Sequence, residues 1–121
     1  MHPDEPRPDI AAAAEDLAVP GPAGTLALLD RHVRDDEIVV CLAAGETASG
    51  RGLLALTNER LVFAAGSSVE TLPLSRVDDV TWNGLLVGVV TIRQGEARMT
   101  VKAVGKADGR RFAEAAKAAL G

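Results

Sequence analysis

The chain has 121 residues, enough for one domain with a single hydrophobic core and, at most, a tail. With two Phe, one Trp and no Tyr it offers almost no aromatic platform, so a nucleic-acid reader that stacks bases is not expected. The net charge of −4 is uneven, because residues 1–40 carry nine acidic and three basic residues, and this excess should repel DNA, RNA and anionic lipid.

Residues 1–22 are predicted to form a mobile acidic tail, rich in proline and alanine, outside a domain that spans residues 23–121. Five of the six prolines lie in this tail and flank an alanine-rich stretch, residues 10–18. Asp9 is placed to cap a helix there, but an isolated helix this short is marginal in water, so we expect it to be transient. The functional alternative is a helix that docks onto a partner.

The first regular elements of the domain are expected at residues 25–34 and 37–43. Leu26, Leu29 and Val33 recur at helical spacing, which predicts an amphipathic leading helix over residues 25–34. Residues 37–43 are rich in apolar and β-branched side chains and predict the first strand.

Two apolar runs, residues 51–57 and 60–64, flank a tight polar turn and predict a β-hairpin. Thr57 and Asn58 favour the turn because their side chains can bond nearby backbone amides, and Asn also tolerates a positive φ. Arg60 follows the turn, where its guanidinium can bind carbonyl groups of neighbouring loops.

Four more strands are expected, at residues 68–74, 79–83, 86–94 and 97–103. In the last of them Met99 and Val101 alternate with Thr100 and Lys102, and this period of two indicates one buried face. Trp82 is interpreted as packing under the barrel or against a helix, with an exposed partner anchor as the alternative.

A closing helix is predicted over residues 107–120. Its apolar stripe is mostly alanine with one large residue, Phe112, so it can approach a sheet closely. The expected fold class is therefore mainly β (α+β): a half-open barrel of about seven antiparallel strands, capped by a C-terminal helix and preceded by a leading helix.

Three local motifs resemble the short bacterial pleckstrin-homology-like (PH-like) domains. Residues 54–63 (LALTNERLVF) resemble the hairpin LxxTNxRLIF, residues 72–82 (LPLSRVDDVTW) the segment xPLxxIxxV, and residues 84–92 (GLLVGVVTI) the strand GLLxGxITI. The motifs stand in the family's order, and the resemblance covers about residues 37–120 without the N-terminal tail. It implies a PH-like binding scaffold and no particular reaction.

Specific phosphoinositide binding, the best-known PH activity, is not expected. The lipid-binding members carry several Lys or Arg around the first hairpin, and a phosphate pocket needs converging cations or amide donors. Here residues 44–51 contain one base, Arg51, and one acid, Glu46.

The sequence predicts that the protein is not an enzyme and needs no cofactor. His2 and His32 are not spaced with Ser, Cys or Asp as a catalytic triad would be, and no His or Cys cluster has metal-ligand spacing. Cys41, in an apolar strand, is interpreted as a small buried hydrophobe.

The location is predicted to be cytoplasmic. A single cysteine allows no disulfide within the chain, which suits a reducing compartment. Asp4 and Glu5 stand where a secretory signal would be basic, and no stretch approaches the roughly 20 apolar residues of a membrane span.

A group of seven bases in the last two strands and the closing helix forms the candidate contact surface for an acidic partner or an anionic membrane. Only three acids accompany them between residues 90 and 121. The alternatives are a solvated face, or a surface that docks the protein's own acidic tail. The seven candidate residues are Arg93, Arg98, Lys102, Lys106, Arg110, Arg111 and Lys117.

The predicted function is a non-catalytic interaction or scaffolding module that binds an unidentified protein partner. Self-association is included, because a half-open barrel leaves edge strands to which Leu85, Leu86 and Val87 add apolar surface. The competing arrangement is a monomer whose leading helix covers the open edge.

Two other functions are weighed against protein binding. The alternative is a peripheral binder of anionic membrane surfaces that uses the C-terminal bases. A carrier of a small ligand is disfavoured, because the interior of the barrel should be filled by Leu56, Phe63, Val89 and Val101.

Overall fold

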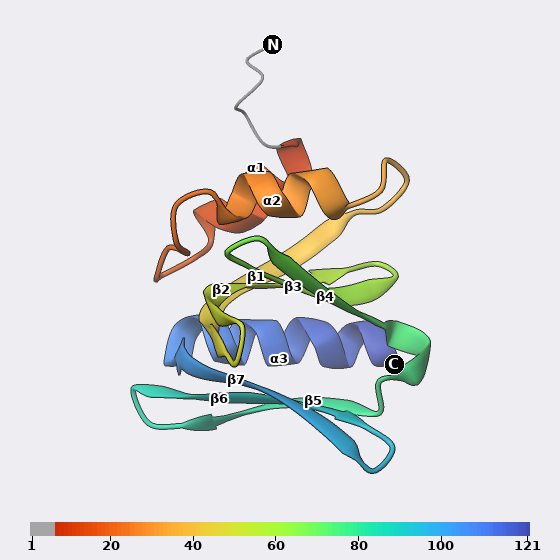
Figure 1. The fold of residues 1–121 in the computed structure, drawn as a ribbon. Helices are drawn as coiled ribbons and strands as arrows, with labels where there is room; N and C mark the ends of the chain where they lie inside the picture. The colour runs from red at the N-terminus through yellow and green to blue at the C-terminus, as the bar shows by residue number, and fades with distance from the viewer. Residues whose placement is uncertain (1–6) are drawn as a thin grey trace.

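The computed structural model describes residues 7–121 and resolves the order of elements expected from the sequence (Figure 1). Three α-helices, seven strands and one short 3₁₀ helix lie in this part of the chain. They are α1 (Pro8–Glu15), α2 (Thr25–His32), β1 (Val39–Thr47), β2 (Gly50–Thr57), β3 (Arg60–Ala65), β4 (Ser68–Pro73), η1 (Leu74–Arg76), β5 (Asp79–Gly84), β6 (Val87–Gln94), β7 (Ala97–Gly105) and α3 (Lys106–Leu120).

The seven antiparallel strands form one sheet in the order β4-β3-β2-β1-β7-β6-β5. Its two halves are joined by a single β1–β7 pair, Glu46 with Lys102, and the terminal strands β4 and β5 do not pair with each other. Figure 1 shows α3 between the β1–β4 layer and the β5–β7 layer. The predicted half-open, helix-capped PH-like fold is confirmed.

The core between the two layers is built around α3. Phe112 and Ala116 of this helix are fully buried among the side chains of both sheet halves. Leu56, Phe63 and Val101 belong to this core as predicted, but Val89 does not. Side chains alternate along β6, and Val90 and Ile92 are its buried residues, so Val89 lies on the other face.

Trp82 packs against α3, which confirms the interpretation of this residue as structural. Its indole Nε1 donates a hydrogen bond to the carbonyl oxygen of Val104 at 3.1 Å. The ring lies so close to Gly109 that a Cβ built there would be 2.2 Å from Trp82 Cδ1. The glycine is therefore required for the approach of the helix to the indole.

Gly109→Ala is expected to destabilise the fold by about 1–3 kcal/mol, the range for overpacking a core. In an unconstrained helix the same change would stabilise by roughly 0.5–1 kcal/mol, so the sign separates the two effects. Thermal unfolding of the wild type and the variant measures it, and an unchanged or raised Tm would contradict the close contact.

A second core lies on the opposite face of the β1–β4 layer, under α1 and α2. It contains Ile10 and Ala13 of α1, Leu29 of α2, and sheet residues including Val62. The continuous apolar runs of β2 and β3 follow from this arrangement, because these strands are buried on both faces.

Two expectations about the N-terminal region differ from the structure. The stretch expected to be a transient helix in a tail is a helix packed on β1, with Ile10 at 0% exposure. The leading helix α2 covers the outer face of the sheet and not an open edge, because its contacts are with β2 and β3. Residues 1–6 of the predicted tail lie outside the described residues.

Polar contacts also attach the N-terminal region to the sheet and to α3. Asp9 does not cap α1; its carboxylate accepts a hydrogen bond from the backbone N–H of Val39 at 2.7 Å. The buried carboxylate of Asp108 in α3 accepts hydrogen bonds from the N–H groups of Ala18 and Val19 at 2.8 and 3.0 Å. The chain between α1 and α2 is thereby fixed beside the start of α3.

A buried ion pair joins the first strand region to the β2–β3 turn. The Glu37 side chain is 0% exposed, and its oxygens accept hydrogen bonds from Arg60 Nε at 2.8 Å and Arg60 Nη2 at 3.0 Å. Thr57 Oγ1 and the backbone N–H of Arg34 also donate to this carboxylate, at 2.6 and 3.1 Å. Arg60 also donates to the carbonyl oxygen of His32, the last residue of α2, so its backbone acceptor is a helix end and not the loop carbonyl expected from the sequence.

These bonds determine the charge state of Glu37. Burial alone would raise its pKa, but the hydrogen bonds from Arg60, Thr57 and the Arg34 amide outweigh burial and lower the pKa from 4.5 to about 2. The group is therefore ionised in the folded protein at neutral pH.

The lowered pKa predicts a loss of stability in acid. Because the pKa of Glu37 is lower in the folded state than in the unfolded state, the ionised group stabilises the fold. This contribution is present above the unfolded-state pKa of 4.5 and is lost as the pH falls toward the folded-state pKa of about 2. The stability difference between wild type and Glu37→Gln should therefore shrink by about 2 kcal/mol between pH 7 and pH 3. Urea unfolding at the two pH values measures this difference, and a constant value would contradict the assignment.

Candidate functional site

The seven predicted contact bases occupy several parts of the surface. Arg93 and Arg98 are cross-strand partners on β6 and β7, and with Asp79 and three neutral polar residues of β5 and β6 they line a shallow depression. Arg110 and Lys117 line a different depression, where α3 meets Trp82 and β5 and where Glu114 lies between them along the helix. Lys106 begins α3.

Three of the seven bases face an acid. Arg93 pairs in register with Asp79, and Lys102 pairs in register with Glu46. Arg111 Nη2 lies 2.7 Å from Oδ1 of Asp108, a carboxylate that is only 1% exposed. Arg111 therefore has a structural role at the start of α3, and the local positive charge is smaller than the sequence count indicates.

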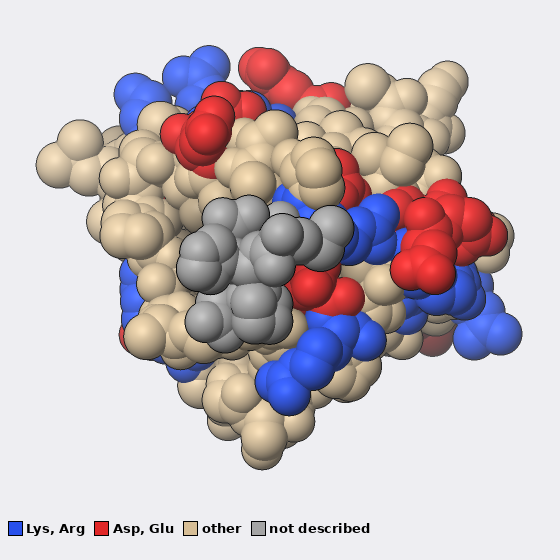
Figure 2. Space-filling view, turned by 90° about the horizontal axis from the view of Figure 1, so that it is seen from above, with Lys and Arg blue, Asp and Glu red and all other residues tan. Residues whose placement is uncertain are grey.

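The face that carries α1 and α2 has no single sign of charge in the part of the chain described. Figure 2, which looks down on this face, shows acidic and basic side chains next to one another. Two of the contacts are ion pairs, Arg7 with Asp9 at 3.2 Å and Arg34 with Glu59 at 2.7 Å.

The most exposed large apolar side chains of residues 7–121 gather at the β5–β6 turn. Leu85 is 85% exposed, Leu86 83% and Val87 60%. We call these three residues the apolar tip. It projects at one end of the β5–β7 layer, on the left of Figure 1. Val19 is also exposed and lies beside Gly105, the register partner of Val87.

The apolar tip is held in a fixed position by its backbone. The N–H of Lys106 donates to the carbonyl oxygen of Leu86 at 3.0 Å. Gly84 and Gly88 face each other across the hairpin, and a Cβ on Gly88 would be 2.0 Å from the carbonyl oxygen of Asn83. These two glycines allow the tight closure that exposes the leucines.

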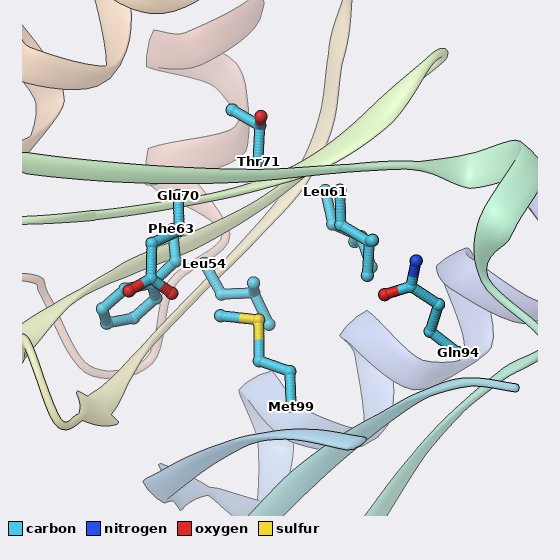
Figure 3. A pocket seen from close by; sticks show the side chains of 8 residues that line it. Leu54, Leu61, Phe63, Glu70, Thr71, Gln94 and Met99 are labelled. Atoms are coloured by element: carbon cyan, nitrogen blue, oxygen red, sulfur yellow. The ribbon is translucent and has the colours of Figure 1, made fainter. Parts of the chain in front are cut away.

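An apolar cavity of about 280 Å³ opens between β4 and the β6–β7 hairpin. Figure 3 shows Met99 reaching toward Leu54 and Phe63 from the opposite layer, with Gln94 at the side. Glu70 also borders the cavity, and its Oε1 accepts a hydrogen bond from Ser49 Oγ at 3.1 Å.

The comparison with known families agrees with this geometry. Residues 33–118 match the family model described as the bacterial PH domain. The chain belongs to the bacterial PH domain family. The predicted resemblance is therefore confirmed, and α1 and α2 precede the matched region. No curated protein matches the sequence. PH domains are in general binding and scaffolding modules, and membership places this chain in that class.

Residues with possible reactivity are few in the described part of this PH domain. Cys41 is buried in the inner core, as predicted, and burial raises the pKa of its thiol. His32 Nδ1 lies 3.0 Å from the carbonyl oxygen of Leu28 in its own helix. Residues 7–121 contain no group of three potential metal ligands, and none of their helices is long and apolar enough to cross a membrane.

The sequence signalled one of the two apolar features and not the other. Leu85, Leu86 and Val87 stand out as an apolar run between two glycines and were expected to add apolar surface to an edge strand, but they lie at the β5–β6 turn. The described residues that line the cavity come from five strands, β2, β3, β4, β6 and β7, so no local pattern marks it.

Proposed function

We propose that this PH domain is a protein-interaction module that inserts its apolar tip into an apolar groove of a partner protein. The observation that carries the proposal is the exposure of Leu85, Leu86 and Val87 on a turn with a fixed backbone. Adjacent exposed apolar residues mark interaction surfaces, and a preformed turn avoids the entropic cost of ordering a loop on binding.

A protein partner is favoured over an anionic bilayer by the charges around the domain. Arg93, Lys102 and Arg111 each face an acid, which reduces the positive charge available to attract lipid headgroups. The net charge of −4 acts in the same direction. The anionic-membrane function predicted from the C-terminal bases is therefore the competing outcome of the test.

Site-specific photo-crosslinking in the native cell tests the proposal. A photoreactive amino acid at position 86 should yield a discrete protein adduct, and Leu85→Ser in the same chain should reduce its yield severalfold. The matched control is the same photoreactive residue at Lys117, which is exposed on α3 away from the tip. An adduct at twice the chain mass would identify the partner as a second copy.

Three results would overturn the proposal. They are no protein adduct from position 86, the same adduct in equal yield from position 117, and an adduct that is lipid alone.

A further inference from the structure

The outer edge of β4 presents backbone groups that have no strand partner in the described chain. β4 is the terminal strand of the sheet and pairs with β3 alone. The N–H of Leu74 donates to the carbonyl oxygen of Glu59 at 3.0 Å, so Leu74 and Glu59 are a hydrogen-bonded pair. The other hydrogen-bonded pairs of β3 and β4 can be counted from this one along the register. Because bonded pairs alternate in an antiparallel ladder, Glu70 and Leu72 face β3, whereas Val69 and Thr71 direct their N–H and C=O groups outward.

The apolar cavity lies directly beside this edge. Glu70, Thr71 and Leu72 all line it, but the Thr71 side chain points to the other side of the strand in Figure 3. Thr71 therefore contributes its main chain to the rim of the cavity. Hydrogen-bonding groups at the edge and an apolar space below it are the two components of a site for an extended peptide.

We infer that β4 accepts an extended segment of a partner protein as an added strand, and that one apolar side chain of this segment fills the cavity. Side chains of a strand alternate between its faces, so every second residue of the added strand points the same way as Glu70 and Leu72. On this side of β4, Glu70 and Leu72 face Met99 across the cavity, as Figure 3 shows for Glu70. The cavity, of about 280 Å³, is lined mainly by apolar side chains and has room for one apolar side chain.

Charge indicates the composition of the segment. Among the described residues that line the cavity, Glu70 has the one charged side chain. A Lys or Arg two positions from the apolar anchor lies on the same face of the added strand and would meet this carboxylate, so the expected sequence is an apolar residue, Leu or an aromatic, with a basic residue two positions away. This site is separate from the apolar tip, because no tip residue lines the cavity and the tip lies at the β5–β6 turn.

Selection from a library of random 12-residue peptides displayed on phage, with the purified full chain as bait, tests the inference. Peptides that combine an apolar anchor with a basic residue should be enriched. Fluorescence anisotropy with the strongest of them should show binding at least tenfold weaker to Thr71→Pro, which removes an outward N–H but none directed at β3. Thr71→Val keeps the N–H and is the matched control, and Glu70→Lys should reverse the preference for the basic residue.

A second measurement does not depend on the folding of a variant. Two peptides are made, one methylated at the odd backbone nitrogens and one at the even nitrogens, so that each lacks the donors of one edge. The peptide that lacks the donors facing β4 should bind at least tenfold more weakly than the unmethylated peptide. Leu85→Ser with Leu86→Ser should leave peptide affinity unchanged, which separates this site from the proposed function. The inference is overturned if no peptide is enriched, if binding survives both methylation patterns, or if the selected peptide binds Thr71→Pro as tightly as the wild type.

Discussion

Replacing Arg60 with methionine is expected to lower the free energy of unfolding by about 3–5 kcal/mol. The substitution keeps an unbranched side chain of similar length but removes both hydrogen bonds to Glu37, whose carboxylate is fully buried. An uncompensated buried charge is costly, and the loss extends to the bond from Arg60 to the carbonyl oxygen of His32. Chemical denaturation followed by circular dichroism measures the change.

The matched control for this prediction is Arg34→Gln. Arg34 also forms an ion pair with a short distance, 2.7 Å to Glu59, but these side chains are 60% and 42% exposed. Exposed pairs contribute about 0–1 kcal/mol, so this variant should unfold near the wild-type midpoint. Equal losses for Arg34→Gln and Arg60→Met would contradict the role assigned to the buried network.

The substitution Ile10→Ala is expected to cost about 2–5 kcal/mol, the range for truncating a buried Ile to Ala. Ile10 is fully buried in the second core, against residues of β1 to β3 and α2. A residue in a mobile tail would give no effect, so this variant distinguishes the observed packing of α1 from the arrangement expected from the sequence. Equilibrium unfolding in urea provides the measurement.

Ala12→Ser is the control on the same helix, because Ala12 is exposed and its replacement should change stability by at most about 0.5 kcal/mol. Limited proteolysis adds a structural readout: cleavage in residues 16–24 should be faster in Ile10→Ala than in Ala12→Ser. Unchanged stability and unchanged cleavage in Ile10→Ala would show that α1 does not hold its place on the sheet.

The strands and the closing helix were predictable because their signals are local. Hydrophobic periodicity and the turn residues Thr57 and Asn58 place β2, β3 and β7 within a few residues of their observed bounds. The side-chain bonds of the turn are observed, since Thr57 Oγ1 accepts from the N–H groups of Glu59 and Arg60 and Asn58 Oδ1 from that of Ile38. Asn58 does not use a positive φ, which among the described non-glycine residues occurs at Ala103. These contacts span few residues or adjoining strands.

What could not be predicted depends on contacts between distant residues. The propensity of an isolated helix underrates α1, because its stability comes from burying Ile10 on the sheet and not from its own length. One signal was available: β2 and β3 are apolar at consecutive positions, which indicates strands covered on both faces. Glu37 was counted only as an acidic residue of the N-terminal third. Its partner Arg60 is 23 residues away in the chain, so the pair appears only in the folded structure.

The candidate site shows the same division. The apolar tip is a continuous run in the sequence, whereas the spread of the seven bases follows from strand register and from the pair Arg111–Asp108. Four of the bases, Arg93, Arg98, Arg110 and Lys117, line two depressions that share Thr81 and Asn83. Their contact with a partner remains a prediction for individual residues. Arg98 and Lys106 face no acid in the pairs described above, whereas Glu114 lies between Arg110 and Lys117.

Co-sedimentation with vesicles tests most directly whether a protein or a bilayer covers the apolar tip. The probes are neutral phosphatidylcholine vesicles and vesicles with added phosphatidylserine, at low and at near-physiological salt, with wild type and Leu85→Ser/Leu86→Ser compared. We predict that the wild type stays in the supernatant with both vesicle types at near-physiological salt, where exposed charges are largely screened. Sedimentation with anionic vesicles at that salt, lost in the double variant, would contradict protein binding as the function of the tip.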